Sequence, residues 1–115
     1  MNLFKSCVLG SVMLGAGLGG AHAQAWTSST VRIVVPYPAG TEPDVLARDL
    51  GNALSKQTGK TFVVDNKPGA NSIIGTDAVA KAEPDGATLL MVDRLALVTN
   101  PMLYSKLPYK WEEAV

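Results

Sequence analysis

The chain contains three short apolar runs that are separated by more polar, helix-like segments. The runs are Val31–Val35, Thr61–Val64 and Thr88–Val92, and none of them shows a regular alternation of polar and apolar residues. Such runs are typical of strands that are covered on both faces of a parallel sheet. We therefore predict three parallel strands, with Val31–Val35 in the middle of the sheet.

Two helices are predicted between these strands. From Pro43 to Gln57 apolar residues recur at three- and four-residue spacing, and this helix should end near Gly59. Its predicted buried side is formed by Leu46, Leu50, Ala53 and Leu54. A second, weaker helix is predicted from Ser72 to about Lys81, with Ile74, Ala78 and Ala82 on its apolar side.

The order strand, helix, strand, helix, strand predicts an α/β fold with a parallel sheet in βαβαβ order. The turn residues Pro84-Asp85-Gly86 separate the second helix from the third strand. After Val92 no further helix is predicted. Asn100-Pro101 and Leu107-Pro108 are interpreted as irregular connections.

The first 23 residues have the order of a secretory signal. Lys5 precedes an apolar, glycine-rich run that ends in Ala21-His22-Ala23, an A-x-A cleavage site. A membrane anchor is the alternative, but the run is shorter than the roughly 20 apolar residues of a membrane span. Cleavage is expected after Ala23, which predicts a periplasmic mature chain, residues 24–115.

Cleavage also limits the chemistry of the mature chain. Cys7 and His22 are the only cysteine and histidine in the sequence, so their removal excludes disulfides, cysteine or histidine metal sites and Ser-His-Asp triads. Ten basic and ten acidic residues balance without a basic cluster, which argues against nucleic acid as a partner. No dinucleotide, P-loop or esterase motif is present, and neither a metal nor a cofactor is expected.

Ligands of open parallel sheets bind at the carboxyl ends of the strands, and three segments of this chain are predicted to lie there. The first, Pro36 to Asp44, contains Tyr37, Pro38, Ala39, Gly40 and Thr41 directly before a helix, where exposed backbone amides suit an anion. Thr41 and Asp44 also have the spacing of a capping box. Both roles remain open, and Glu42 should point toward solvent.

The other two segments are Asn66 to Ser72 and Asp93 to about Thr99. Ala70 allows a close approach to the backbone, and Asn71 or Ser72 is expected either to cap the second helix or to donate to a ligand. Asp93 and Arg94 follow the third strand. They are interpreted as a solvated surface pair, or else Arg94 grips a carboxylate in a bidentate way.

Several longer motifs, taken in order, point to one family. They are Arg32-Ile33-Val34-Val35-Pro36-Tyr37-Pro38-Ala39-Gly40, Asp44-Val45-Leu46-Ala47-Arg48, Val64-Asp65-Asn66-Lys67-Pro68-Gly69-Ala70 and Pro84-Asp85-Gly86-Ala87-Thr88-Leu89-Leu90. With these motifs the mature chain resembles the Bug-type receptors that serve tripartite tricarboxylate transporters. The resemblance covers essentially all of residues 24–115.

The resemblance implies a type II periplasmic-binding fold, of which residues 24–115 would be the N-terminal part of the first domain, with the second domain absent. It implies a receptor, not an enzyme, that binds a small organic carboxylate and delivers it to membrane permease subunits. In the family the first strand-end loop holds a ligand carboxylate through backbone groups and ordered water, which maps onto Tyr37 to Asp44. The second and third loops map onto Ala70 to Ser72 and Asp93 to Leu95.

The sequence leaves two further functional hypotheses open. One is a truncated, functionally silent fragment of such a receptor, and an open reading frame that continues past the Val115 codon would argue against it. The other is a periplasmic enzyme that uses Asp44 and Asp93 as acid and base, but no histidine, cysteine or nucleophile motif supports it.

Overall fold

The computed structural model describes residues 27–110, so the predicted signal and its cleavage site lie outside the described residues. The elements are β1 (Thr30–Val35), α1 (Glu42–Thr58), β2 (Thr61–Asn66), α2 (Ile73–Ala80), β3 (Thr88–Leu90) and α3 (Arg94–Leu103). The three strands form a parallel sheet in the order β2-β1-β3. The prediction of a central first strand in an α/β fold is therefore confirmed.

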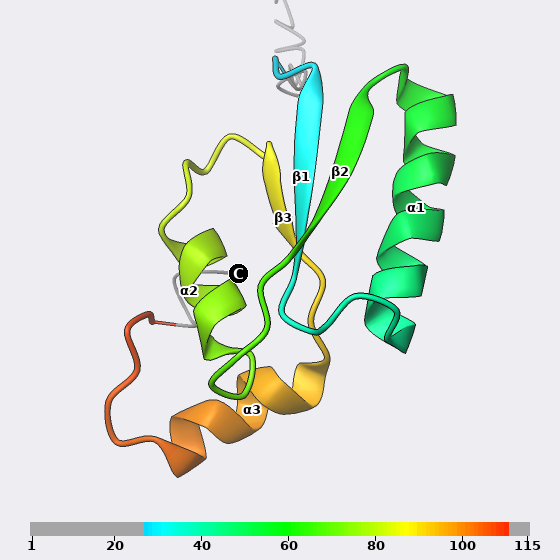
Figure 1. Cartoon of the computed structure of the whole chain (residues 1–115). Helices are drawn as coiled ribbons and strands as arrows, with labels where there is room; N and C mark the ends of the chain where they lie inside the picture. The colour runs from blue at the N-terminus through cyan, green and yellow to red at the C-terminus, as the bar shows by residue number, and fades with distance from the viewer. Residues whose placement is uncertain (1–26, 111–115) are drawn as a thin grey trace, which may run out of the picture.

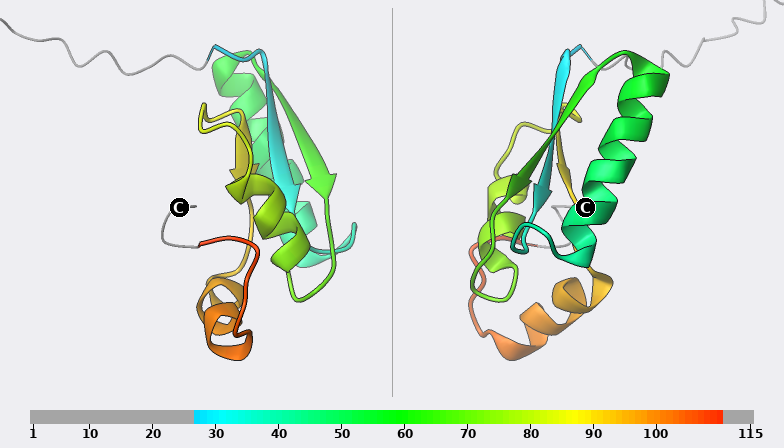
Figure 2. Two further views of the ribbon diagram at one scale, coloured as in Figure 1. Left: turned by 90° about the vertical axis from the view of Figure 1, so that its left-hand side faces the viewer. Right: turned by 45° about the vertical axis from the view of Figure 1, so that its right-hand side comes forward.

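The helices surround the sheet on three sides. Figures 1 and 2 show α1 on one face of the sheet, α2 on the other face, and α3 across the carboxyl ends of the strands. Within residues 27–110 no helix has both the length and the apolar character needed to cross a bilayer.

Strand β1 forms the centre of the core because both of its faces are covered. Val31, Ile33, Val34 and Val35 are each no more than 2 % exposed. Burial of each such side chain stabilises the fold by about 1.5–3 kcal/mol relative to its exposure. Ile33 and Val35 cluster with Ala47 of α1, so this face of the strand holds α1 in place.

The predicted apolar face of α1 is wrong. Leu46 and Leu50 are 57 % and 42 % exposed, whereas the residues buried against the sheet are Asp44, Ala47 and Gly51. The helix lies so close to the strands that a Cβ on Gly51 would be only 3.3 Å from Phe62 Cβ. Small residues allow this close approach, which leucine side chains on the same face would prevent.

Small residues also form the buried side of the second helix, α2. Its buried residues are Gly75 and Thr76, while Ile74, predicted to be buried, is 52 % exposed. A Cβ on Gly75 would lie 2.6 Å from Pro36 Cβ and 3.0 Å from the Lys67 carbonyl oxygen. Gly75 is therefore the residue that allows α2 to pack on the end of β1.

The sequence did not predict α3, and the interpretation of Asn100-Pro101 as an irregular connection is wrong. Asp93 caps this helix by accepting a hydrogen bond from the Ala96 amide at 2.7 Å. Pro101 lies inside the helix, where it lacks an amide hydrogen. The neighbouring Asn100 is 1 % exposed and hydrogen-bonded to Asn71, and this anchor holds the helix in spite of the proline.

Candidate functional site

The ends of the three strands meet at one small pocket. The loops after β1 and β2 and the start of α3 converge at the carboxyl edge of the sheet (Figure 1), the usual place for a ligand in an open parallel sheet. The pocket there has a volume of about 190 Å³. It is lined by Tyr37, Asn71, Ser72, Asp93, Leu95, Ala96, Thr99 and Leu103.

Tyr37 and Asp93 join the first and third segments of this edge. The Tyr37 hydroxyl donates to Asp93 Oδ2, and the Asp93 amide donates to Tyr37 Oη at 3.3 Å. The hydrogen bond from Tyr37 is the main cause that lowers the pKa of Asp93, with the Ala96 amide next. Burial, followed by the hydrogen bond to Asp93, raises the pKa of Tyr37.

Asp93 and Arg94 are both exposed, as the interpretation of a solvated surface pair has it, but the two side chains are not paired with each other. Asp93 is bonded to Tyr37 and to the Ala96 amide. Arg94 is the exposed first residue of α3 and stands outside the set that lines the pocket. Asp93 therefore belongs to the pocket, and Arg94 lies beside it.

The loop before α2 has an unusual backbone. Ala70, Asn71 and Ser72 have φ values of 47°, 53° and 69°, and each non-glycine residue in the left-handed region costs roughly 1–2 kcal/mol. Asn100 stabilises this conformation, because its side chain accepts from Asn71 Nδ2 at 2.6 Å and donates to the Asn71 carbonyl at 2.9 Å. The loop is thus held in shape by α3.

The expected cap of α2 by Asn71 or Ser72 is not formed. Ser72 occupies the N-cap position without a side-chain capping bond, and the Asn71 side chain is bonded to Asn100 instead. Because a left-handed residue cannot place its hydroxyl as an ordinary N-cap does, Ser72 remains beside the pocket. Ser72 is buried, with 5 % of its surface exposed, and it is one of the residues that line the pocket.

The capping box predicted at the start of α1 is also wrong. Thr41 is the N-cap, but its hydroxyl donates to the Pro38 carbonyl at 2.7 Å. The Asp44 carboxylate accepts from the Gly40 amide at 2.8 Å, and the Thr41 amide is directed to the Pro38 carbonyl at 3.4 Å. Two amides that we expected to bind an anion are thus engaged within the loop. Glu42 is exposed, as expected.

Asp44 lies under this loop and does not face the pocket. Its side chain is only 3 % exposed. It accepts hydrogen bonds from Arg48 Nη2 at 3.0 Å, Arg48 Nε at 3.1 Å and Asn66 Nδ2 at 2.9 Å. Asn66 also donates to the Tyr37 carbonyl at 3.1 Å. The carboxylate therefore connects the loop after β1 to the end of β2 and positions Tyr37 through Asn66.

These bonds make the stability of the loop dependent on pH. The hydrogen bonds from Arg48, then from the Gly40 amide and Asn66, lower the pKa of Asp44 from 3.8 to about 2. A folded-state pKa below the unfolded value means that the ionised carboxylate stabilises the fold above pH 3.8, and that this stability is lost as the pH falls toward about 2.

We predict that Asp44→Asn lowers the melting temperature of the complete protein at neutral pH, because an amide group would face donors that need an acceptor. The difference from wild type should stay constant between about pH 7 and 5 and narrow below about pH 4. Thermal melts from about pH 2 to 7 measure it, with Asp49→Asn on the exposed side of α1 as a control. A difference that stays constant down to about pH 2 would contradict this role of Asp44.

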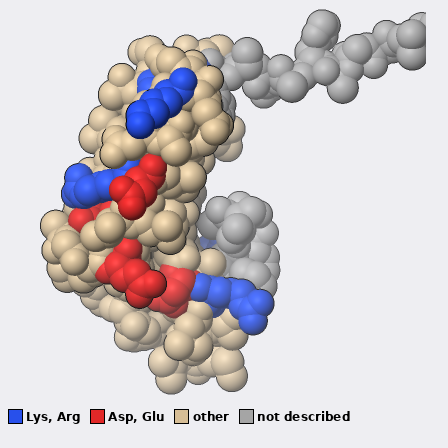
Figure 3. Space-filling view, turned by 90° about the vertical axis from the view of Figure 1, so that its right-hand side faces the viewer, with Lys and Arg blue, Asp and Glu red and all other residues tan. Residues whose placement is uncertain are grey.

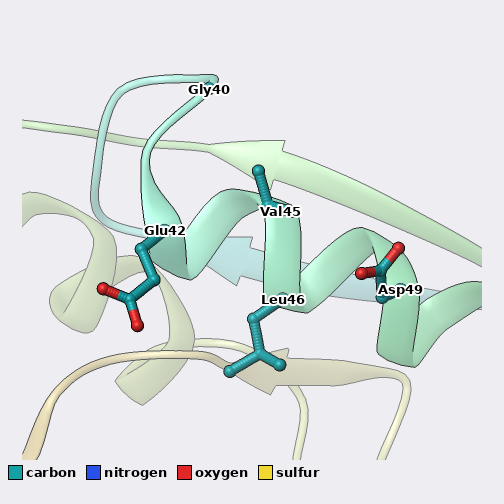
Figure 4. A pocket seen from close by; sticks show the side chains of 5 residues that line it. All are labelled: Gly40, Glu42, Val45, Leu46 and Asp49. Carbon is teal, nitrogen blue, oxygen red and sulfur yellow. The ribbon is translucent and has the colours of Figure 1, made fainter.

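A second hollow lies alongside α1 and is larger, about 380 Å³. It is lined by Gly40, Glu42, Val45, Leu46 and Asp49, which all come from α1 and the loop before it (Figure 4). Lysine and arginine lie in separate groups on this side of the molecule, with carboxylates between them (Figure 3). Among residues 27–110 no group of three or more metal-binding side chains occurs.

The structure thus brings together Tyr37, Asn71, Ser72 and Asp93 from the predicted site. It places Pro38, Ala39, Gly40 and Thr41 in the turn beside the pocket, Asp44 beneath that turn, Ala70 in the strained loop and Arg94 outside the pocket. Sequence reasoning did not single out Ala96, Thr99 and Leu103, which line the pocket from α3. Asp93, three residues before Ala96, was the available signal for this helix start.

Comparisons with known proteins agree on one kind of molecule. Residues 46–114 match the model of the tripartite tricarboxylate transporter family receptor. A UPF0065 protein of Bordetella bronchiseptica is 42 % identical over 96 % of this chain and 33 % of its own length. Protein BugT of Bordetella pertussis is 37 % identical over 90 % of this chain and 32 % of its own.

Solved structures show the same likeness. A structure described as a periplasmic transporter is similar to this chain, with a TM-score of 0.70 and 37 % identity. The match covers 75 % of this chain and 29 % of the transporter chain. The periplasmic binding protein BugD matches 71 % and 27 %, with a TM-score of 0.66 and 40 % identity. The chain spans about a third of the length of the curated relatives. The family model describes a receptor and BugD is a binding protein, in agreement with the expectation that this chain is not an enzyme.

Proposed function

The chain belongs to the tripartite tricarboxylate transporter receptor family, and from this premise we propose that the complete protein is a periplasmic receptor for a small organic carboxylate. It would bind its solute without covalent chemistry and deliver it to the membrane permease subunits of a tripartite transporter. Residues 24–115 would form the N-terminal part of the first of two domains.

The observation that supports this proposal most directly is the pocket at the carboxyl edge of the sheet. Polar side chains from three separate segments line it: that of Tyr37, those of Asn71 and Ser72, and that of Thr99. Leu95 and Leu103 supply an apolar border. A few polar groups in a partly apolar pocket are typical of a site for a small solute.

Export is a separate part of the proposal. It rests on Lys5, the apolar run and Ala21-His22-Ala23, and on the periplasmic binding proteins among the relatives. Mass spectrometry of periplasmic material should find a mature N-terminus at Gln24, and an intact Met1 there would contradict export by cleavage.

Filling the pocket should weaken solute binding. We predict that Thr99→Phe weakens the binding of carboxylates to the complete protein by roughly 10- to 100-fold, because an aromatic ring would occupy a pocket of this size. Isothermal titration calorimetry against a panel of organic acids measures the effect. Circular dichroism and the melting temperature show whether the variant is folded.

The matched control is Val98→Phe. Val98 is the preceding residue of α3, is 54 % exposed and does not line the pocket. The Val98→Phe variant should therefore bind carboxylates with the affinity of the wild type. Equal affinity in Thr99→Phe and the wild type would show that this pocket is not the binding site, and a panel in which no carboxylate binds would overturn the proposed function.

A further inference from the structure

One charged side chain stands in a pocket whose other polar groups are neutral. Among the residues that line the pocket, Asp93 alone carries a charge, whereas Tyr37, Asn71, Ser72 and Thr99 do not. A receptor for simple carboxylates gains nothing from a negative charge at this place, because like charges repel each other.

Building on the proposed function, we propose that Asp93 makes the receptor selective for solutes that carry a protonated amine in addition to a carboxylate. The Asp93 carboxylate would accept a hydrogen bond from the ammonium group of the solute. The solute carboxylate would lie on the far side of the pocket, toward the Asn71 and Ser72 side chains.

The hydrogen-bond donors to the Asp93 carboxylate are neutral. Oδ1 accepts from the Ala96 amide at 2.7 Å and Oδ2 accepts from the Tyr37 hydroxyl. The pKa of Asp93 is likewise set by Tyr37, backbone amides and burial, and not by a cation. Lysine or arginine instead forms ion pairs with other carboxylates, those of Asp44, Asp65 and Asp77. The negative charge of Asp93 is thus stabilised by hydrogen bonds from neutral groups.

The carboxylate also has acceptor positions left over. An ionised carboxyl group offers about four lone-pair positions, and the two hydrogen bonds above use two of them. The Tyr37 hydrogen bond lowers the pKa of Asp93, so the group stays ionised at neutral pH. Its side chain borders the pocket and is exposed to solvent. An ammonium group of a solute can therefore reach it.

Capping of α3 does not explain the charge. The cap uses one oxygen atom, Oδ1, toward the Ala96 amide. Asparagine caps helices about as well as aspartate does, and its Nδ2 amide, in the place of Oδ2, can donate to Tyr37 Oη once the Tyr37 hydroxyl turns. Asp93→Asn therefore removes the charge and can retain the fold, which makes it the informative variant.

The experiment compares matched pairs of solutes on the complete protein by calorimetry. Each pair shares a carbon skeleton and differs by one amine, such as propionate and β-alanine, succinate and aspartate, or glutarate and glutamate. The wild type should bind the amine-bearing member of a pair about 10- to 100-fold more tightly, the range for a hydrogen bond to a charged group. Asp93→Asn should lose most of this preference.

The control is Asp49→Asn, which removes the same charge from the exposed side of α1, outside this pocket, and should keep the preference. Carboxylate binding without a preference for the amine, or a preference that survives in a folded Asp93→Asn, would overturn this inference and leave the proposed receptor function intact. Failure of all carboxylates to bind, with or without an amine, would overturn both.

Discussion

Replacing Gly75 with alanine is expected to destabilise the complete protein by up to about 2 kcal/mol, although alanine is the better helix former. The new Cβ would meet Pro36 Cβ at 2.6 Å and the Lys67 carbonyl oxygen at 3.0 Å. Neither atom belongs to a flexible side chain, so α2 would have to move away from β1. Overpacking of this kind costs about 1–3 kcal/mol, and the helix propensity of alanine returns only about 1 kcal/mol.

Denaturant unfolding of wild type and variant measures this loss. Gly51→Ala is the matched control, because Gly51 is also a buried helical glycine, but its new Cβ would meet Phe62 Cβ at 3.3 Å and the Ile33 side chain at 3.6 Å. We expect Gly51→Ala to be close to neutral. A stabilising Gly75→Ala would show that α2 does not approach β1 as closely as the structure has it.

The sheet could be predicted from the sequence because its signal is local and strong. An uninterrupted run such as Val31–Val35 needs cover on both faces, and only a central strand between two helices provides it. The order of the elements then fixed which loops share an edge, so Tyr37, Asn71 and Asp93 could be assigned to one site before their contacts were known.

The buried faces of the helices could not be predicted in the same way. Periodicity assigns the largest apolar side chains to the core, so it predicted that Leu46 and Leu50 face the sheet. The close packing of α1 instead required Ala47 and Gly51, and small residues carry little weight in a hydrophobic pattern. The exposed leucines of α1 also belong to a chain that spans only a third of the length of its relatives.

The third helix was missed because Pro101 counts against a helix in any local pattern. Its stabilisation is not local: Asn100 is anchored to Asn71, which is 29 residues away in the sequence. The pocket depends on this helix, so the sequence could include Thr99 only as the end of a predicted binding segment, and Leu103 lay beyond that segment. The hydrogen bond between Tyr37 and Asp93 could not be predicted either, because it joins residues that are 56 positions apart in the sequence.

Loss of that anchor should have the second large effect. We predict that Asn100→Ala destabilises the complete protein by about 2–3 kcal/mol, since it removes both hydrogen bonds of a side chain that is only 1 % exposed and leaves the Asn71 amide and carbonyl groups without these partners. Solute binding should weaken as well, because Asn71 and Ser72 line the pocket. Asn52→Ala, at an exposed position of α1, should stay within about 0.5 kcal/mol of wild type.

A second substitution separates the anchor from a general packing role. If Asn100 acts by holding the left-handed backbone at Asn71, where φ is 53°, glycine at that position should tolerate the conformation without help. Asn71→Gly introduced into Asn100→Ala should therefore recover part of the lost stability, by roughly 1 kcal/mol, since it removes the cost of the left-handed residue and the unpaired amide together. Denaturant unfolding of the two single variants and the double variant forms a complete thermodynamic cycle. Losses that simply add in the double variant would show that Asn100 stabilises the protein by filling space, and not by fixing the loop that borders the pocket.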